Sequence, residues 1–182
     1  KGKDIFLHIG SATSNVRVWV NGKEVGYSED SKLEARFDIT KYVKQGENLI
    51  ALEIFRWCDG TYMEDQDFWR FTGIARDVYV YSREKNRIED IRVLASASGE
   101  ASLYAEVSKG VSALEFTVTD PYGKEVASQT VAVASKERSE RGLPVVRTVM
   151  QVPSVKQWTA ETPWLYTLDV KVFNKKGQTE ET

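Results

Sequence analysis

Hydrophobic residues recur at every second position along most of this chain. The clearest runs are Val16, Val18 and Val20, then Leu103, Ala105 and Val107, then Leu168, Val170 and Val172. Successive side chains of an extended strand point to opposite faces, so this alternation is typical of strands with one buried face. No long segment keeps the 3.6-residue period of a helix, and the best helical candidate is one turn over residues 40–43, capped by Asp38 or Thr40. The pattern predicts an all-β fold.

Residues that favour tight turns separate these runs. Asn21-Gly22 is the typical pair of a type I′ hairpin turn, because both positions tolerate a positive φ. Residues 120–123 read Asp-Pro-Tyr-Gly, which suits a type I turn, and residues 175–177 read Lys-Lys-Gly, which suits a third hairpin tip. The turns therefore predict antiparallel strands that follow one another along the chain.

The composition removes several classes of function. The 182 residues carry 25 Lys and Arg against 27 Asp and Glu, a net charge of −2, which offers no basic footprint for nucleic acid or for a membrane surface. No apolar run approaches the roughly 20 residues that span a bilayer. One cysteine, Cys58, and one histidine, His8, exclude an internal disulfide and a Cys/His zinc site within the chain, so carboxylates must carry any chemistry. We expect a soluble protein, cytoplasmic or periplasmic, in which His8 is a satisfied strand residue.

The chain changes character near residue 84. Large aromatic side chains are frequent before this point, whereas short strands and charged turns follow it, as in a small antiparallel sandwich. The polar stretch 82–86 has the composition of a linker, so we place a domain boundary at about residue 85. Neither part holds enough strands to close its sheet edges, and open edges favour aggregation. We therefore expect a piece of a longer protein.

Residues 56–70 do not follow the strand pattern. They hold four carboxylates, two tryptophans, one tyrosine and two arginines: Arg56, Trp57, Asp59, Tyr62, Glu64, Asp65, Asp67, Trp69 and Arg70. Flat aromatic rings stack on the C–H faces of sugars, while carboxylates accept hydrogen bonds from sugar hydroxyls. The segment is therefore a candidate carbohydrate site.

The same composition allows three other interpretations. The loop can be a structural lid, in which its two arginines neutralise its carboxylates in a buried network. The acidic run 64–67 can bind calcium, although it lacks the glycine and the spaced oxygens of a hand-type loop. Two carboxylates can also form a glycosidase pair, but such a pair must stand about 5 to 10 Å apart across the substrate, which neighbouring loop positions rarely achieve.

Three longer motifs stand out when they are taken together. They are Arg56-Trp57-x-Asp59-Gly60-x-Tyr62-x-Glu64-Asp65-Gln66-Asp67-x-Trp69-Arg70, followed by Gly73-Ile74-x-Arg76-Asp77-Val78; upstream, Val20-Asn21-Gly22-Lys23-x-Val25-Gly26-Tyr27-Ser28-x-Asp30-Ser31; and downstream, Trp158-x-x-Glu161-x-Pro163-x-Leu165-Tyr166. Together they resemble the β-galactosidases of glycoside hydrolase family 2, over nearly the whole chain and in that family's domain order. The resemblance implies a partial jelly-roll, galactose-binding-like domain at residues 1–84. An immunoglobulin-like β-sandwich that lacks its last strand would follow at residues 85–182.

The resemblance also implies a function for the longer protein. Family β-galactosidases hydrolyse terminal β-galactosides with retention, using two glutamates of a barrel domain to which nothing in this chain corresponds. No catalytic residue is therefore expected here. In the family, the aspartate of the Arg-Trp-x-Asp-Gly motif, here Asp59, reaches into the barrel's pocket, where it binds galactose and a sodium ion.

The other loop residues have supporting roles in this interpretation. The three aromatic residues Trp57, Tyr62 and Trp69 are expected to pack and hold the loop. The three acidic residues Glu64, Asp65 and Asp67 are expected to have structural or domain-contact roles. Asp59 thus remains the one residue of the chain that is expected to bind substrate and metal.

The chain is therefore expected to be the non-catalytic N-terminal portion of a β-galactosidase. Its partners would be a β-galactoside and its own barrel domain. Its cation would be Na⁺. The sequence does not decide whether Mg²⁺ is required or which linkage the substrate has. It also leaves open the oligomeric state, for which a homo-oligomer is one possibility. Two other classes are alternatives: a stand-alone carbohydrate-binding module, and a structural scaffold that docks a barrel and builds an oligomer.

Overall fold

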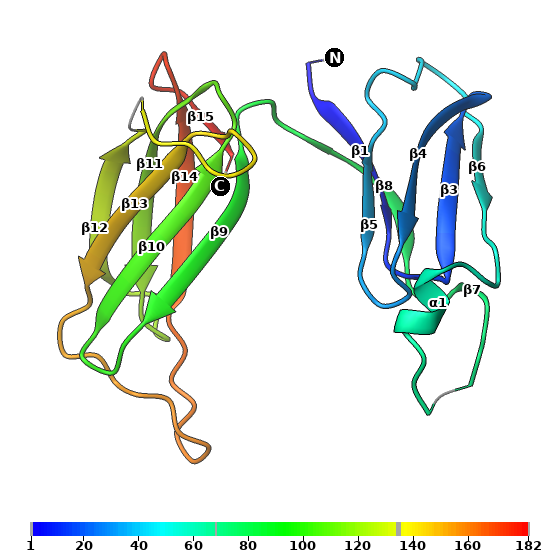
Figure 1. Cartoon of the computed structure of the whole chain (residues 1–182). Helices are drawn as coiled ribbons and strands as arrows, with labels where there is room; N and C mark the ends of the chain where they lie inside the picture. Colours follow the sequence, from blue (N-terminus) through cyan, green and yellow to red (C-terminus); the bar gives the residue numbers. More distant parts are fainter. Residues whose placement is uncertain (1, 68, 134–135, 182) are drawn as a thin grey trace. The chain divides into compact units, whose positions relative to one another are not determined.

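The computed structural model describes residues 2–67, 69–133 and 136–181. The chain divides into two compact units, one ending at Arg83 and the other beginning at Glu84 (Figure 1). Every strand pair in the described residues is antiparallel, so the all-β prediction is confirmed. No helix in this part of the chain has the length and apolar character that are needed to cross a bilayer.

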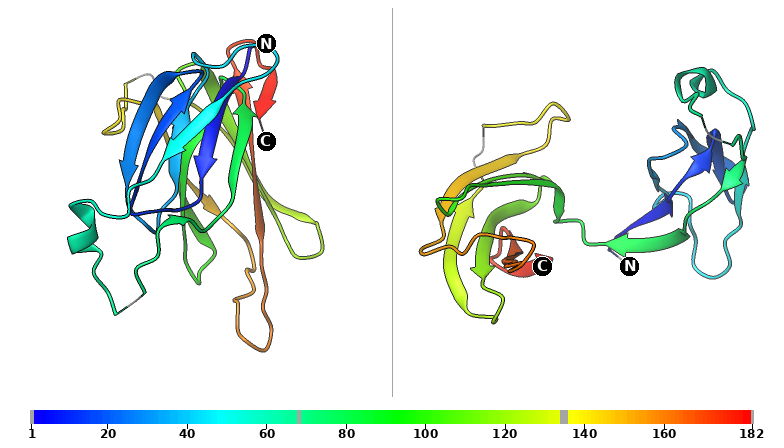
Figure 2. Two further views of the ribbon diagram at one scale, coloured as in Figure 1. Left: turned by 90° about the vertical axis from the view of Figure 1, so that its right-hand side faces the viewer. Right: turned by 90° about the horizontal axis from the view of Figure 1, so that it is seen from below.

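The first unit contains two three-stranded sheets that face each other, and a short two-stranded ladder (Figures 1 and 2). Its strands are β1 (Asp4–Ile9), β2 (Ala12–Thr13), β3 (Asn15–Val20), β4 (Lys23–Glu29), β5 (Ala35–Asp38), β6 (Ile50–Glu53), β7 (Gly73–Ile74) and β8 (Val78–Arg83). One sheet has the order β5-β1-β8 and the other the order β4-β3-β6, while β2 pairs with β7. The central strands β1 and β3 therefore come from the two opposing sheets.

Alternate residues of these two central strands fill the core of the first unit. The residues that are at most 1% exposed are Leu7, Ile9, Val16, Val18 and Val20. Their burial confirms the alternation predicted for residues 16–20. Moving each of these side chains out of water contributes roughly 1.5–3 kcal/mol, so the core stabilises the sheets that carry the loops.

The turn between β3 and β4 also follows the prediction. Asn21 and Gly22 have φ angles of 51° and 78°, as a type I′ turn requires. His8 in β1 is a satisfied strand residue, because its ring stacks on Tyr79 with 4.3 Å between ring centroids and its Nδ1 lies 3.0 Å from Glu34. These two predictions are confirmed.

The single turn predicted over residues 40–43 is present, but the structure assigns it as a turn and not as a helix. Residues 40–43 form a hydrogen-bonded turn in which Asp38 accepts from the Thr40 N–H at 2.9 Å, as the capping signal indicates. The helix in the described residues is instead α1 (Gly60–Met63). Its glycine and threonine are weak helix formers, so contacts from elsewhere in the unit must stabilise it.

The second unit is also a sandwich of two antiparallel sheets, with the orders β13-β10-β9 and β12-β11-β14-β15. Its strands are β9 (Ile88–Ala95), β10 (Glu100–Val107), β11 (Val111–Thr119), β12 (Glu125–Ala132), β13 (Val145–Gln151), β14 (Thr167–Asn174) and β15 (Thr179–Glu181). The predicted turns lie between β11 and β12 and between β14 and β15. They are confirmed, because Gly123 donates its N–H to Asp120 O and Gly177 to Asn174 O, both at 2.9 Å.

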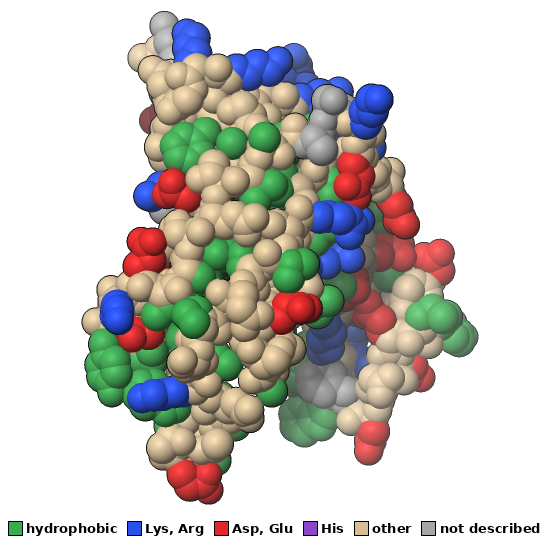
Figure 3. Space-filling model, turned by 90° about the vertical axis from the view of Figure 1, so that its left-hand side faces the viewer, with side chains coloured by type: hydrophobic (Ala, Val, Ile, Leu, Met, Phe, Trp, Pro, Cys, Tyr) green, Lys and Arg blue, Asp and Glu red, His purple; other side chains and the backbone are tan. Residues whose placement is uncertain are grey.

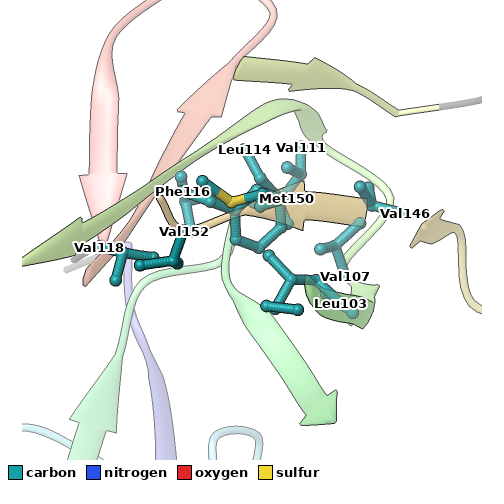
Figure 4. Packing of buried hydrophobic residues seen from close by; sticks show 12 residues of the cluster. Leu103, Val107, Val111, Leu114, Phe116, Val118, Val146, Met150 and Val152 are labelled. Atoms are coloured by element: carbon teal, nitrogen blue, oxygen red, sulfur yellow. The ribbon is translucent and has the colours of Figure 1, made fainter. Parts of the chain in front are cut away.

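Side chains of both sheets meet in the core of the second unit (Figure 4). Phe116 and Leu114 of β11 are fully buried against β10 and β13, which contribute Leu103 and Met150. The predicted alternation holds in β10 and in β14, where Leu168 and Val170 are partly buried against the core and Val172 is fully buried. The described β15 pairs with the end of β14 at residues 172–173, so the rest of that strand has one uncovered edge.

On the face that Figure 3 shows, basic, acidic and hydrophobic side chains are all exposed. This mixture agrees with the near-neutral net charge of −2. A face of this kind offers no broad basic surface to a polyanion.

Candidate functional site

The candidate site lies in the loop of residues 54–72, which connects β6 to β7 at one end of the first unit. This loop carries α1 and extends beyond the strands (Figures 1 and 2). Its first residues are attached to the buried segment between β2 and β3. The Ser14 hydroxyl donates to Phe55 O at 3.1 Å, and the Phe55 N–H donates to Asn15 Oδ1 at 3.1 Å. Ser14 and Asn15 are themselves buried, so the loop leaves the sandwich from a fixed point.

Asp59 occupies the N-cap position of α1 and is exposed. An aspartate at this position commonly accepts a hydrogen bond from the first turn of its helix. Here the side chain makes no such bond. Instead, the Thr61 hydroxyl accepts a bond from the Cys58 N–H at 3.1 Å and closes the start of the turn. The Asp59 carboxylate is therefore not used for capping and is open to a ligand.

Glu29, at the end of β4, lies beside Asp59. One ligand atom from each of Glu29, Cys58 and Asp59 lies within 4.8 Å of the others. The Tyr27 hydroxyl donates a short hydrogen bond to the Glu29 carboxylate. That bond, together with partial burial and the negative charge of Glu29, raises the pKa of Tyr27 to about 12. Tyr27 thus holds a second carboxylate close to the predicted ligand.

The donor set of this group suits a hard cation only in part. Asp59 and Glu29 offer carboxylate oxygens, which alkali and alkaline-earth ions prefer, whereas the Cys58 thiol is a soft ligand. These two oxygens are too few to surround a cation, so a site here would need further oxygen ligands from substrate, water or another domain. The Asp59 carboxylate is thus of the donor type that the predicted sodium site requires.

Glu64 connects the end of α1 to another part of the unit. Its Oε1 accepts a hydrogen bond from the Ser31 N–H at 2.8 Å, across 33 residues of sequence. Its own N–H donates to Gly60 O at 3.0 Å and closes the helix. Glu64 therefore bonds both to the helix and to the segment between β4 and β5.

The packing role predicted for the aromatic residues of the loop is wrong for this chain. Trp57, Tyr62 and Trp69 are 55%, 90% and 76% exposed. Trp57 contacts Arg56 and Arg70, whose guanidinium carbons lie 5.3 and 5.4 Å from its ring centroid. Hydrogen bonds to backbone groups, and not burial of these rings, attach the loop to the unit, so much of each ring surface is exposed to solvent.

Several residues of this loop line a hollow of about 340 Å³. Among the residues that line it are Arg56, Trp57, Glu64, Asp65, Asp67, Trp69, Arg70 and Phe71. Asp65 pairs with Arg70, but their side chains are 56% and 44% exposed, so the pair does not form the buried network of the lid interpretation. The acidic run 64–67 gives no group of three metal-ligating side chains within the described residues. The hollow remains a mixed aromatic and charged surface.

Sequence reasoning did not find Glu29 as a neighbour of Asp59. The two residues are 30 positions apart, and the loop geometry at the end of β4 brings them together. For Glu64 the sequence predicted a structural or domain-contact role but not its hydrogen-bond partner Ser31. Glu64 is a named residue of the longest motif, whereas Glu29 falls on an unspecified position of the upstream motif, so only its acidic character could have pointed to it.

Two protein-family models match this chain. A family model described as "Glycosyl hydrolases family 2, sugar binding domain" matches residues 2–84, and another described as "Glycosyl hydrolases family 2" matches residues 86–182. The chain therefore belongs to glycosyl hydrolases family 2. It carries the sugar-binding domain of the family followed by its immunoglobulin-like domain.

Two sequence relatives of this chain are named β-galactosidases. A protein named Beta-galactosidase from Priestia megaterium is 38% identical over 193 residues, which cover 100% of this chain and 18% of the relative. A Beta-galactosidase from Clostridium acetobutylicum is 36% identical over 180 residues, covering 97% of this chain and 20% of the relative. The chain thus spans about a fifth of the length of these relatives.

Solved structures confirm the fold of the two domains. A β-glucuronidase from Ruminococcus gnavus, in complex with uronic deoxynojirimycin, matches with a TM-score of 0.79 and 21% identity, over 99% of this chain and 32% of that one. A β-glucuronidase from Bifidobacterium dentium matches with a TM-score of 0.73 and 18% identity, over 94% of this chain and 34% of that one. At this level of identity the likeness concerns the fold and not the substrate.

Proposed function

We propose that this chain is the non-catalytic N-terminal portion of a retaining β-galactosidase and that Asp59 contributes to its substrate and cation site. The catalytic glutamates would lie in a barrel domain outside this chain, so we expect the chain alone to be inactive. The β-galactosidase relatives at 36–38% identity support the choice of substrate class.

The free carboxylate of Asp59 is the observation that carries this proposal. It lies at an exposed N-cap without an intramolecular capping bond, on a loop that is attached to buried residues at its base. A fixed carboxylate of this kind can accept hydrogen bonds from sugar hydroxyls and can ligate Na⁺. Its role would be to orient substrate and cation, because the proton transfers belong to the barrel. Glu29 would supply a second oxygen near the same cation.

The exposed aromatic hollow supports a contact with the barrel domain. Trp57, Trp69 and Phe71 present large apolar surfaces together with paired charges, a composition typical of protein interfaces. Because the hollow belongs to the same loop as Asp59, a barrel docked here would receive the Asp59 carboxylate at its pocket. The partners of the chain would then be its own barrel domain and a β-galactoside.

The test is hydrolysis of a chromogenic β-galactoside by the full-length protein, measured against sodium concentration. The wild type is compared with Asp59→Asn, and with Glu47→Gln as a control for loss of an exposed carboxylate elsewhere in the unit. We expect Asp59→Asn to lose about 100-fold or more in kcat/KM, together with its sodium dependence. A variant that stays as active and as sodium-responsive as the wild type would show that Asp59 has no part in the site.

A stand-alone carbohydrate-binding module is the second candidate, because the hollow exposes two tryptophans beside carboxylates. Aromatic faces and carboxylates are the groups that such modules use to bind sugars. Tryptophan fluorescence of this chain, titrated with galactose and lactose, distinguishes the two functions. A saturable change that Trp69→Ala abolishes would favour the module, whereas the β-galactosidase proposal predicts no response without the barrel.

A further inference from the structure

The helix that carries Asp59 is too short to be stable by itself. It has four residues, and forming one isolated helical turn is unfavourable because several backbone dihedrals are fixed for a single hydrogen bond. No residue of α1 is buried, so hydrophobic packing does not stabilise it either. The direction of the Asp59 side chain therefore depends on what holds the two ends of this turn.

The start of the turn has a local bond and a long thiol contact, from Cys58 Sγ to Ser14 O at 3.8 Å, whereas its end has a shorter bond across the unit. At the start, the Cys58 N–H donates to Thr61 Oγ1 at 3.1 Å. At the end, Glu64 Oε1 accepts from the Ser31 N–H at 2.8 Å. Ser31 is buried, with 6% of its surface exposed. The bond to Glu64 is therefore a connection from the turn to a fixed part of the sandwich.

The segment that donates this bond is itself well ordered by short-range hydrogen bonds. Asp30 Oδ1 accepts from the Lys32 and Leu33 N–H groups, each at 2.9 Å. These two bonds lower the pKa of Asp30. The Ser31 N–H is not used within this turn and instead donates to Glu64. The donor thus has a defined direction, which is what a positioning contact requires.

We propose that Glu64 is a positioning residue for the substrate and cation site: its hydrogen bond to the Ser31 N–H fixes α1, and through α1 the Asp59 carboxylate. This inference rests on the proposed function of Asp59. The bond requires an acceptor that reaches Ser31, and it does not require a negative charge at that acceptor. Glu64 acts through Asp59 and touches neither substrate nor cation.

Two substitutions distinguish the effect of the length of the Glu64 side chain from the effect of its charge. Glu64→Gln keeps the length of the side chain and an acceptor oxygen but removes the charge, whereas Glu64→Asp keeps the charge but shortens the side chain by one methylene. Both are made in the full-length protein, with Glu64→Ala, Asp59→Asn and the control Glu47→Gln. The measurements are KM and kcat for a chromogenic β-galactoside, the sodium concentration for half-maximal activity, and the melting temperature.

We expect Glu64→Gln to stay within about twofold of the wild type in all kinetic constants. Glu64→Asp and Glu64→Ala should each raise KM and the half-maximal sodium concentration about 3- to 30-fold, since misplacing a binding group by an ångström can cost up to about 100-fold. In the Asp59→Asn background, the same changes at position 64 should have no further effect, because a residue that acts through Asp59 is silent when that carboxylate is gone.

Several results would overturn the inference. Glu64→Asp and Glu64→Ala variants that melt earlier but keep wild-type KM and sodium response would show a structural role only. Effects that add to those of Asp59→Asn would show that Glu64 acts independently, and a Glu64→Gln variant as impaired as Glu64→Ala would show that charge matters. If Asp59→Asn itself is silent, the proposed function fails; if Asp59→Asn is impaired and Glu64→Asp is not, only this inference fails.

Discussion

Arg141 and Glu106 form a doubly hydrogen-bonded ion pair on the second domain, with Nε and Nη2 of Arg141 donating to Oε2 of Glu106 at 2.8 and 2.5 Å. The Tyr104 hydroxyl donates to the other carboxylate oxygen at 3.1 Å. Burial alone would raise the pKa of Glu106, but the bonds from Arg141 and Tyr104 and the charge of Arg141 outweigh it and lower this pKa. The carboxylate form is therefore favoured in the folded domain.

This pair predicts a pH dependence of stability. Because the pKa of Glu106 is lower in the folded than in the unfolded chain, its contribution is complete above the ordinary value of 4.5 and is lost as the pH falls through the folded value. Glu106→Gln should lower the melting temperature of the second domain at pH 7, and the difference from wild type should shrink as the pH falls below 4.5. Glu100→Gln, an exposed glutamate of the same strand, should show no such difference. A difference in melting temperature between Glu106→Gln and wild type that stays constant with pH would contradict the prediction.

Gly99 should not tolerate a side chain. Its φ is +88°, and a Cβ at this position would lie 2.3 Å from the Val152 carbonyl oxygen, which is backbone and cannot move aside. Gly123 is the matched control, because it has a φ of +80° but open space around it. In chemical denaturation we expect Gly123→Ala to cost about 1–2 kcal/mol from the backbone alone. Gly99→Ala should cost at least about 2 kcal/mol more, and equal losses would show that the backbone relaxes around Val152.

Tyr27 should titrate well above the ordinary tyrosine pKa of 10. Its pKa of about 12 results first from the hydrogen bond to Glu29, then from partial burial and the charge of Glu29. A raised folded pKa favours the neutral phenol, so this contribution is complete below pH 10 and is lost as the pH rises through 12. NMR titration of ring-labelled tyrosine should show this late resonance, which Tyr27→Phe removes. In Glu29→Gln the resonance should move back toward 10; a resonance that does not move would mean that Glu29 is not its partner.

Trp69 should matter to the full-length protein and not to this chain alone. Its side chain is 76% exposed, and removing an exposed side chain usually changes the free energy of unfolding by no more than about 0.5 kcal/mol. Trp69→Ala in the full-length protein should lower the melting temperature and increase proteolysis of the loop, because the docking surface is lost. Leu49→Ala, another exposed apolar residue of the first unit, is the control. A loss above about 1 kcal/mol in the isolated chain would instead place Trp69 in the packing of the loop.

The strands and turns could be predicted because their signals are local. The alternation at residues 16–20 and the pair Asn21-Gly22 each encode a conformation within a few positions. The helix α1 could not be predicted, since its stability comes from Glu64 and a backbone N–H that is 33 residues away. The neighbours of Asp59 were hidden for the same reason. The resemblance of the motifs identified Asp59 as a candidate, whereas the hydrogen bonds around it depend on tertiary structure.

The bond between Glu64 and residue 31 also limits how this site can vary. Its donor is a main-chain N–H, which nineteen of the twenty amino acids supply and proline alone lacks. Position 31 can therefore drift among small residues that fit its buried surroundings without disturbing α1. Position 64 has no such freedom, because its part of the bond is made by a side chain. Sequence divergence in this loop should consequently be uneven, with one partner of the contact nearly neutral and the other confined to glutamate and glutamine.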